Sequence, residues 1–267
     1  MSETAKLDRD LRCKFWRKRI LEISQKVSAL HIAPAFSCVE IVDLIYFEFI
    51  KNLKSNKSDI FIMSKGHGSI IQYLILNELG FISDSEIDGF CLNGSQLGTH
   101  PDYETNGINA STGSLGHGLG IAVGQAYAEL QKKSGVLVYC LISDGELQEG
   151  STWEAIMMAA NLKLSNLVLF IDLNDFGGLE KMSAAFKSFY PLDSKLTSFG
   201  WEIFQVDGHN QNMICQAFQK RRLNGPSAII CRTIKGKGIS FMENVPIWHY
   251  RSPTQSEFQL ALNELGI

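Results

Sequence analysis

Two uninterrupted apolar runs constrain the fold more than any other feature of the chain: VLVYCLIS at residues 136–143 and LVLFIDLN at residues 167–174. Both are rich in β-branched residues and show no alternation, as is typical of strands that are buried on both faces. Residues 151–162, between them, have the apolar spacing of a helix. The order strand, helix, strand predicts an α/β fold, with an open parallel sheet and helices on both of its faces.

The same alternation continues on both sides of this central pair. Further strands are predicted at residues 59–64, 201–206 and 227–234. Helical spacing predicts helices at residues 7–29, 38–50, 70–80, 121–133 and 211–222. Ser37 is the predicted N-cap of the second of these helices. No internal repeat, low-complexity tract or linker interrupts the pattern, so we expect a single domain over residues 1–267.

Composition and charge exclude several classes of protein. A formal net charge of -3 offers no basic surface for nucleic acid. The N-terminal residues lack the apolar core of a signal peptide, and no apolar run is long enough to cross a bilayer. We therefore expect a cytoplasmic protein without nucleic acid or membrane as a partner. The 6 cysteines form no CxxC pair and lie mostly in apolar runs, which favours reduced, buried thiols over a disulfide framework or a zinc site.

Two polar residues follow the central strands directly. Asp144 comes after the first strand, and Asn174 ends the second. Ligands of open parallel sheets bind at the carboxyl ends of the strands, so neighbouring strands would bring both side chains to one edge. A carboxylate and an amide oxygen suit Mg²⁺ or Ca²⁺ with positions left for phosphate oxygens. On these residues alone another interpretation is equally supported, with Asp144 as a helix N-cap and Asn174 as a turn former.

A glycine-rich turn, STGSLGHGLG at residues 111–120, precedes one predicted helix. Its backbone N–H groups could bind an anion, although glycines before a helix are also ordinary turn residues. The 6 histidines lie in polar or glycine-containing segments: His31, His67, His100, His117, His209 and His249. They lack metal-ligand spacing, and a single loop histidine is usually only hydrogen-bonded, so none indicates a function by itself.

Seven runs carry a family resemblance over nearly the whole chain, in the family's order. They are SKGHG (64–68), GTHPD (98–102), TGSLGHGLGIAVGQA (112–126), DGELQEGSTWEA (144–155), NLVLFIDLN (166–174), VDGHN (206–210) and GKGISFMEN with WH (236–249). The sequence resembles the N-terminal half of transketolase, as found in organisms that divide the enzyme between two chains. The SKGH and THP elements are typical of transketolase and its near relatives, and not of the α chains of 2-oxoacid dehydrogenases.

The resemblance implies a thiamine diphosphate-binding fold with a divalent ion, Mg²⁺ or Ca²⁺, at the sheet edge. It assigns the ion to Asp144, Asn174 and the backbone carbonyl of Phe176. The residues it implies at the cofactor are His67, Gly113, Leu115, Gly145, Asn174, His249 and Glu149. Among these, Glu149 matches a glutamate that family members use at the subunit interface, where it communicates with the partner's cofactor-activating glutamate.

The implied reaction is transfer of a two-carbon ketol unit from a ketose, often a sugar phosphate, to an aldose. The cofactor supplies the electron sink, and the protein supplies orientation, proton transfer and exclusion of water. His31 and His100 would face the substrate's hydroxyls near C1 and C2, and His249 would lie between diphosphate and substrate.

The glutamate that activates the cofactor belongs, in the family, to a pyrimidine-binding domain, and the sequence shows no second α/β unit that could provide it. The resemblance therefore implies a partner, a separate C-terminal transketolase subunit, in an α2β2 assembly. It also implies that this chain is inactive alone.

Several residues depart from the family pattern: Ser143 in place of glycine, His117 in place of glutamine, Tyr250 and Arg251 in place of Gly-Lys, and the runs at 32–36 and 175–180. An extended backbone would tolerate Ser143. Arg251 could bind an anionic end of the substrate or be a surface residue.

These departures leave three alternatives to a transketolase of primary metabolism. The substrate could be a modified or branched sugar in polysaccharide or natural-product biosynthesis. The chain could be a non-catalytic homologue that binds only the cofactor or a partner, although the retained Asp144, Asn174 and histidines argue against this. A different thiamine enzyme acting on a 2-oxo acid would not need the histidines that face a sugar.

Overall fold

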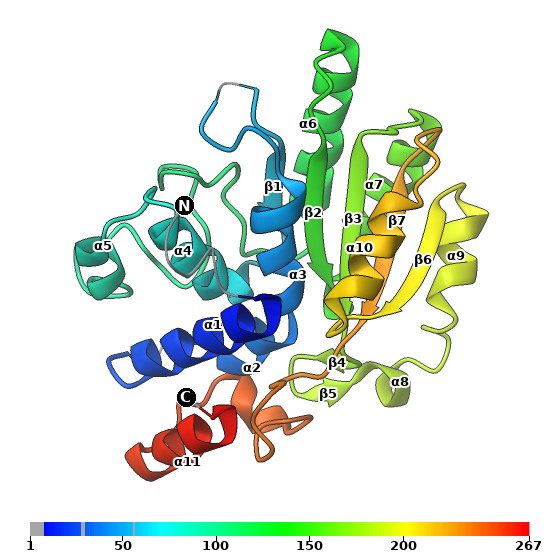
Figure 1. Cartoon of the computed structure of the whole chain (residues 1–267). Coiled ribbons are helices and arrows are strands. Elements are labelled where there is room, and N and C mark those ends of the chain that lie inside the picture. Colours follow the sequence, from blue (N-terminus) through cyan, green and yellow to red (C-terminus); the bar gives the residue numbers. More distant parts are fainter. Residues whose placement is uncertain (1–7, 28–29, 56, 267) are drawn as a thin grey trace.

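A computed structural model of the chain describes residues 8–27, 30–55 and 57–266. Its centre is a five-stranded sheet in the order β1-β2-β3-β7-β6, and every pair of neighbours is parallel (Figure 1). The strands are β1 (Ile60–Met63), β2 (Val138–Ser143), β3 (Leu167–Leu173), β6 (Glu202–Asp207) and β7 (Ser227–Arg232). The predicted α/β class with an open parallel sheet is confirmed, and each predicted strand is found close to its predicted residues.

Helices cover both faces of this sheet, because successive residues of each strand point to opposite sides. Tyr139 and Leu141 of β2 belong to one core with Trp16 and Ile214, whereas the alternate residues Val138, Cys140 and Ile142 belong to a second core. The helices of the first core include α1 (Arg9–Ser24), α3 (Val39–Leu44) and α10 (Gln211–Gln219). Those of the second are α6 (Gly118–Lys132), α7 (Gly150–Asn161) and α9 (Leu192–Ser198).

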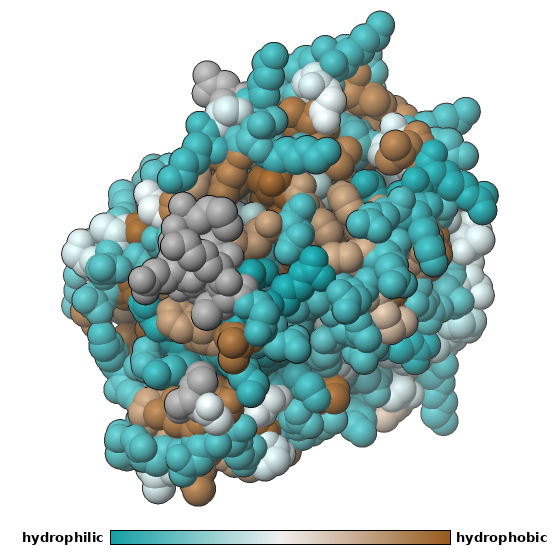
Figure 2. Space-filling model, viewed as in Figure 1, coloured by the Kyte–Doolittle hydropathy of each residue, from teal (hydrophilic) through white to brown (hydrophobic). Residues whose placement is uncertain are grey.

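The other elements lie mostly around the carboxyl edge of the sheet and on the α1 side. They are α2 (Ile32–Ser37), α4 (Ser69–Glu78), α5 (Asp84–Asp88), α8 (Met182–Ala185), α11 (Gln255–Leu265), a π-helix at Ile45–Phe49, the hairpin of β4 (Phe176–Gly177) and β5 (Glu180–Lys181), and 3-10 turns at Gly66–Gly68, Gly145–Gln148 and Pro246–His249. The face that α1, α10 and α11 present is mostly hydrophilic (Figure 2). Within the described ranges, no helix is long and apolar enough to span a membrane.

Near the N-terminus one predicted helix is found but ends earlier than predicted, and one predicted N-cap was wrong. α1 begins at Arg9, with the Asp8 carboxylate accepting from the N–H of Leu11 at 2.9 Å, and it ends at Ser24; positions 7 and 29, its predicted ends, lie outside the described residues. Ser37 does not cap the next helix, because it is the last residue of α2 and donates its hydroxyl to Asp172 at 2.6 Å. Local spacing could not predict this, since the partner lies far away in the sequence.

Two smaller expectations are met. Ser143 is the last residue of β2 and therefore has an extended backbone, which a serine tolerates where a glycine is usual. The 6 cysteines are all unpaired, and Cys13, Cys38, Cys140 and Cys231 are buried.

Candidate active site

A cavity of about 240 Å³ opens at the carboxyl ends of β2 and β3. It is lined by His31, Pro34, His67, Gly113, Leu115, Ser143, Gly145, Asn174, Phe176, Gly178, Lys235, His249 and Tyr250. Most of the site residues expected from the sequence are among them. A larger and more open hollow of about 490 Å³ lies beside it, but that hollow shares only Asn174 with the cavity and contains no histidine.

Asp144 is fully buried beside this cavity, directly after β2. Because β2 and β3 are parallel neighbours, the carboxylate reaches the turn that follows β3. It accepts hydrogen bonds from the N–H groups of Gly145 at 2.9 Å and Asp175 at 2.6 Å. Burial, together with the nearby Asp172 carboxylate, raises the pKa of Asp144 to about 7. A cation bound beside Asp144 would stabilise the ionised form of this buried carboxyl group.

The local contacts of Asp144 and Asn174 show the capping and turn interactions of the second interpretation, and they leave the oxygen atoms at one edge of the cavity. Asp144 caps the 3-10 turn that begins at Gly145, and the Asn174 side chain accepts from the N–H of Phe176 at 3.2 Å. The carbonyl oxygen of Phe176 lies 3.7 Å from where a Cβ on Gly145 would be, so it faces the same edge of the cavity. A carboxylate, an amide oxygen and a carbonyl are thereby gathered at this edge. The described chain contains no cluster of three or more His, Cys, Asp or Glu side chains that could hold a metal.

Four histidines from distant parts of the sequence form one cluster at the cavity. The His31 ring is central, with its centroid 5.3 Å from that of His249, 5.9 Å from His67 and 6.3 Å from His100. The Nδ1 atom of His31 is buried and has no hydrogen-bond partner among the described residues. His100 is not among the lining residues named above, and its ring lies against Gly113 of the glycine-rich turn.

Gly113 is required where this turn meets His100. Its φ of +147° disfavours any side chain, and a Cβ there would come within 2.9 Å of the His100 ring. The absence of a side chain at Gly113 therefore allows the turn to lie close to the ring. This explains why one position of the glycine-rich turn must be a glycine.

Burial lowers the pKa of all four rings, so they are largely uncharged at neutral pH. For His249 the neighbouring Lys235 adds to burial, and the pKa falls to about 3. Lys235 Nζ donates to Nδ1 of His249 at 2.8 Å and to the carbonyl of Gly178 at 2.5 Å. Since Nδ1 of His249 accepts this hydrogen bond from Lys235, the proton of the neutral ring is on Nε2.

Sequence reasoning missed three charged residues of this region: Lys65, Asp172 and Lys235. Lys65 and Asp172 are fully buried and form an ion pair, and Lys65 also donates to the carbonyl of Pro34 at 2.8 Å. Burial alone would lower the pKa of Lys65, but the Asp172 carboxylate outweighs it and raises that pKa. One signal was available, because Asp172 is a charged residue inside a continuous apolar strand, where charges are rare unless they are paired.

The remaining singled-out residues lie at the margins of the site or away from it. Glu149 is exposed at the start of α7 and does not line the cavity, and His117 is exposed on the glycine-rich turn. Tyr250 lines the cavity, with its ring centroid 5.4 Å from His31 and 4.3 Å from His249. Arg251 donates to both Glu257 oxygens, at 2.6 and 2.5 Å, and stacks 4.3 Å above the Trp248 ring. This favours a structural role for Arg251 over an anion-binding one.

A parallel α/β sheet with polar oxygen atoms and a histidine-lined cavity at its carboxyl edge is typical of a cofactor-binding α/β domain. The family model described as transketolase, thiamine diphosphate binding domain, matches residues 17–266. The chain belongs to this family and is a transketolase-type, thiamine diphosphate-binding protein.

Known relatives include proteins of similar length. The chain is 36% identical over 259 residues to a subunit of the apulose-4-phosphate transketolase of Phocaeicola vulgatus, covering 94% of this chain and 91% of that protein. It is 34% identical to the 6-deoxy-6-sulfo-D-fructose transketolase subunit SqwG of a Clostridium species, covering 93% of each. The solved transketolase of Leishmania mexicana superimposes with a TM-score of 0.90 at 23% identity, over 97% of this chain and 41% of that one. The chain thus spans less than half of that solved protein, and the latter likeness concerns the fold.

We expect Lys65→Met to lower the free energy of unfolding by about 3–5 kcal/mol, because it leaves the Asp172 charge buried and unpaired. Adding Asp172→Asn should restore much of this loss, since the lone charge is then gone. Urea unfolding of the single and double variants measures both values.

The control for this prediction is the exposed pair Lys26–Asp88, whose side chains are 61% and 66% exposed. Lys26→Met should cost less than about 1 kcal/mol. A Lys65→Met variant as stable as this control would contradict the prediction.

Proposed function

We propose that this chain is the N-terminal, diphosphate-binding subunit of a two-chain transketolase that transfers a two-carbon ketol unit from a ketose to an aldose. The observation that carries the proposal is the cluster of His31, His67, His100 and His249 beside Asp144 and Asn174. Agreement with two subunits of transketolases over more than nine-tenths of their length supports it.

The residues present fit thiamine diphosphate and a divalent ion, Mg²⁺ or Ca²⁺. Asp144, the Asn174 amide oxygen and the Phe176 carbonyl form a hard-oxygen set that leaves positions for phosphate oxygens. Gly145 lines the cavity without a side chain that would obstruct a diphosphate, and Lys235 supplies positive charge in the same lining. Gly113, Leu115 and His67 would contact the cofactor in the same cavity. The unpartnered Nδ1 of His31 is a polar atom that a ligand would satisfy.

When bound, thiamine diphosphate supplies the carbon nucleophile and electron sink for cleavage of the sugar's C2–C3 bond. The neutral rings of His31 and His100 hydrogen-bond the hydroxyls near C1 and C2 and move protons at those oxygens. His249 presents Nε2–H toward an oxygen of the diphosphate or the substrate. Lys235 holds His249 in that tautomer through its 2.8 Å hydrogen bond to Nδ1.

A separate C-terminal subunit with a pyrimidine-binding domain is the proposed partner, in an α2β2 complex. The surface formed by α6 and α7 supports this, because it exposes Ile121, Tyr127, Met157 and Met158. Gly124 of α6 has nothing within 4 Å of an added Cβ, so a partner helix could approach closely. Glu149 immediately precedes α7 and is exposed beside this surface, in keeping with a role at the interface.

A modified or branched sugar is a second candidate for the substrate. Tyr250 favours it, because an aromatic side chain that is 58% exposed stands at the cavity against His31 and His249. The two relatives named above act, by their names, on apulose 4-phosphate and a sulfonated deoxyfructose. A ketose phosphate of primary metabolism remains the first candidate. The non-catalytic alternative would leave the histidine cluster without a purpose.

Two further expectations belong to the same proposal. The chain forms one domain over residues 1–267, and it works in the cytoplasm. Six unpaired cysteines are consistent with a reducing compartment.

The test of the function is reconstitution with a candidate C-terminal transketolase subunit from the same organism. Ketol transfer is measured from a panel of ketoses and ketose phosphates, including branched and sulfonated sugars, with Mg²⁺ and thiamine diphosphate. We expect activity in the mixture and none with either chain alone. A complex that binds cofactor but uses no member of the panel would contradict the proposed reaction.

Two substitutions should separate cofactor binding from sugar chemistry. We expect Asp144→Ala to abolish Mg²⁺-dependent binding of thiamine diphosphate by the complex, because it removes the charged member of the proposed ligand set. His100→Ala should leave binding nearly unchanged and lower kcat by about 10²–10⁴, the usual contribution of a proton-transferring group. Calorimetric titration of the cofactor and steady-state rates measure the two effects, and loss of neither would refute the site.

The α6–α7 surface gives a further prediction. Met158→Glu should weaken association with the C-terminal subunit by tenfold or more, because it places a charge in an apolar interface, at a cost of ~1.4 kcal/mol or greater. The matched control is Leu223→Glu, since Leu223 is 61% exposed and lies outside this surface. Sedimentation of mixtures measures association, and melting temperatures should be alike. Equal association of both variants would show that this surface is not the interface.

A further inference from the structure

The sequence run Asp207–Asn210 is not used by the site described above, although it belongs to the resemblance. In the structure it joins β6 to α10. Asp207 accepts from the N–H of His209 at 2.9 Å, and Asn210 caps α10 by accepting from the N–H of Met213 at 3.1 Å. Gly208 lies so close to β7 that a Cβ there would come within 2.4 Å of Thr233. This turn is therefore pressed against the end of β7, with His209 directed between two other segments.

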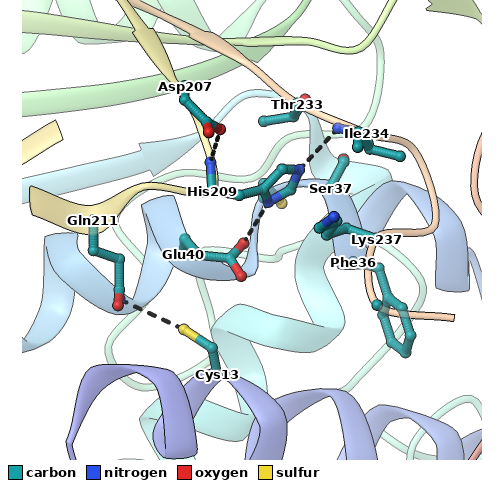
Figure 3. Close-up of polar contacts among 12 residues, drawn as sticks. Cys13, Phe36, Ser37, Glu40, Asp207, His209, Gln211, Thr233, Ile234 and Lys237 are labelled. Carbon is teal, nitrogen blue, oxygen red and sulfur yellow. Dashed lines mark hydrogen bonds and ion pairs between the residues drawn. The ribbon is translucent and has the colours of Figure 1, made fainter. Parts of the chain in front are cut away.

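Both nitrogens of the His209 ring are engaged (Figure 3). Nε2 accepts from the backbone N–H of Ile234 at 2.8 Å, and Nδ1 lies 3.0 Å from Glu40 Oε2. An Nε2 that accepts an N–H carries no proton, so the ring's proton is on Nδ1 and is donated to Glu40. His209 thus links a buried carboxylate on α3 to one particular peptide N–H.

The carboxylate end of this link is rigid. Glu40 forms an ion pair with Arg17 at 2.8 Å, and both side chains are at least nine-tenths buried. Arg17 in turn donates to the carbonyls of Lys237 at 2.8 Å and Phe36 at 3.1 Å. Burial alone would raise the pKa of Glu40, but Arg17 and His209 outweigh it and lower that pKa to about 2. Glu40 therefore remains an acceptor that orients His209.

The peptide end of the link adjoins the cavity. Ile234 directly precedes Lys235, whose Nζ contacts His249 and Gly178 in the cavity. On the other side of Lys235, the N–H of Gly236 donates to the carbonyl of Ala33 at 3.1 Å. The backbone is thus fixed by hydrogen bonds immediately before and after Lys235, and His209 accepts the one before it.

We propose that His209 is a positioning residue that fixes the backbone at Ile234, so that Lys235 and, through it, His249 are held correctly for the cofactor. The proposal rests on the proposed function, because Lys235 and His249 matter only if the cavity binds thiamine diphosphate. It differs from a merely structural role in that the hydrogen bond to Ile234, and not the ring's packing or its contact with Glu40, determines affinity for the cofactor.

Two conservative variants separate these contacts. In His209→Gln, the side-chain oxygen can take the place of Nε2 and accept from Ile234. In His209→Asn, the shorter amide can take the place of Nδ1 beside Glu40, but it leaves the Ile234 N–H without its acceptor. Both variants remove the aromatic ring, so they are matched for that lost packing.

The experiment uses the reconstituted two-chain complex and measures the Kd for thiamine diphosphate with saturating Mg²⁺, together with amide hydrogen exchange at Ile234. We expect His209→Asn to raise the Kd by about tenfold and to speed exchange at Ile234 by a similar factor, as for the loss of one buried hydrogen bond. His209→Gln should remain within about twofold of the wild type in both measurements. Lys235→Met in the wild-type background is the positive control, and its Kd should rise at least as much.

Several outcomes would overturn the proposal. Wild-type affinity in both His209 variants would show that the residue has no influence on the cavity, and equal losses in both would assign the effect to packing. Normal binding by Lys235→Met would refute the role of Lys235 through which His209 acts. A wild-type complex that binds no thiamine diphosphate would refute the proposed function itself, and the positioning role with it.

Discussion

The buried pair of Lys65 and Asp172 is the interaction on which the carboxyl edge of the sheet depends. Lys65 follows β1 and Asp172 lies near the end of β3, so the pair spans β2, which separates these strands. Asp172 also accepts from Ser37 and Thr233, which brings in α2 and the segment after β7. A buried pair contributes little net stability but is costly to break, so it favours one arrangement of these segments over others.

This arrangement explains why most of the fold, but only part of the site, could be predicted from the sequence. The strands and most helices follow from periodicity, and parallel pairing of β2 with β3 then brings Asp144 and the turn at Asn174 together. Long-range side-chain partners leave no such periodic signal. The end of α2 at Ser37, the pairing of Lys65 and the placement of Lys235 each depend on a residue more than ten positions away. Family motifs located the histidines, whereas local rules would have left each of them as an ordinary loop residue.

The charge balance of the cavity favours an anionic ligand at one side and a cation at the other. Lys235 is buried, and burial together with the charge of Lys65 lowers its pKa to about 8, so an anion beside it would stabilise its charged form. The four histidines are largely neutral at neutral pH, so they add no positive charge near Lys235. Elsewhere at the same edge Asp144 and Asp172 repel one another, which adds to burial in raising the pKa of Asp144. A diphosphate with a bound divalent ion would relieve both imbalances at once, because it carries negative charge toward the lysine and positive charge toward the carboxylate.

The segment at residues 234–251, which follows β7, supplies cavity residues from both of its ends, and different contacts hold the two ends in place. The part from Ile234 to Lys237 is tied to the rest of the protein by His209, Ala33 and Arg17, and it supplies Lys235. The part that begins at His249 continues into Tyr250 and Arg251, where Arg251 is held by its local pair with Glu257. Substitutions in the first part would disturb Lys235 in the lining of the proposed cofactor cavity. Substitutions of Tyr250 would change the lining beside His31 without removing a contact of Lys235, so this position could vary with the substrate while the contacts of Lys235 are kept.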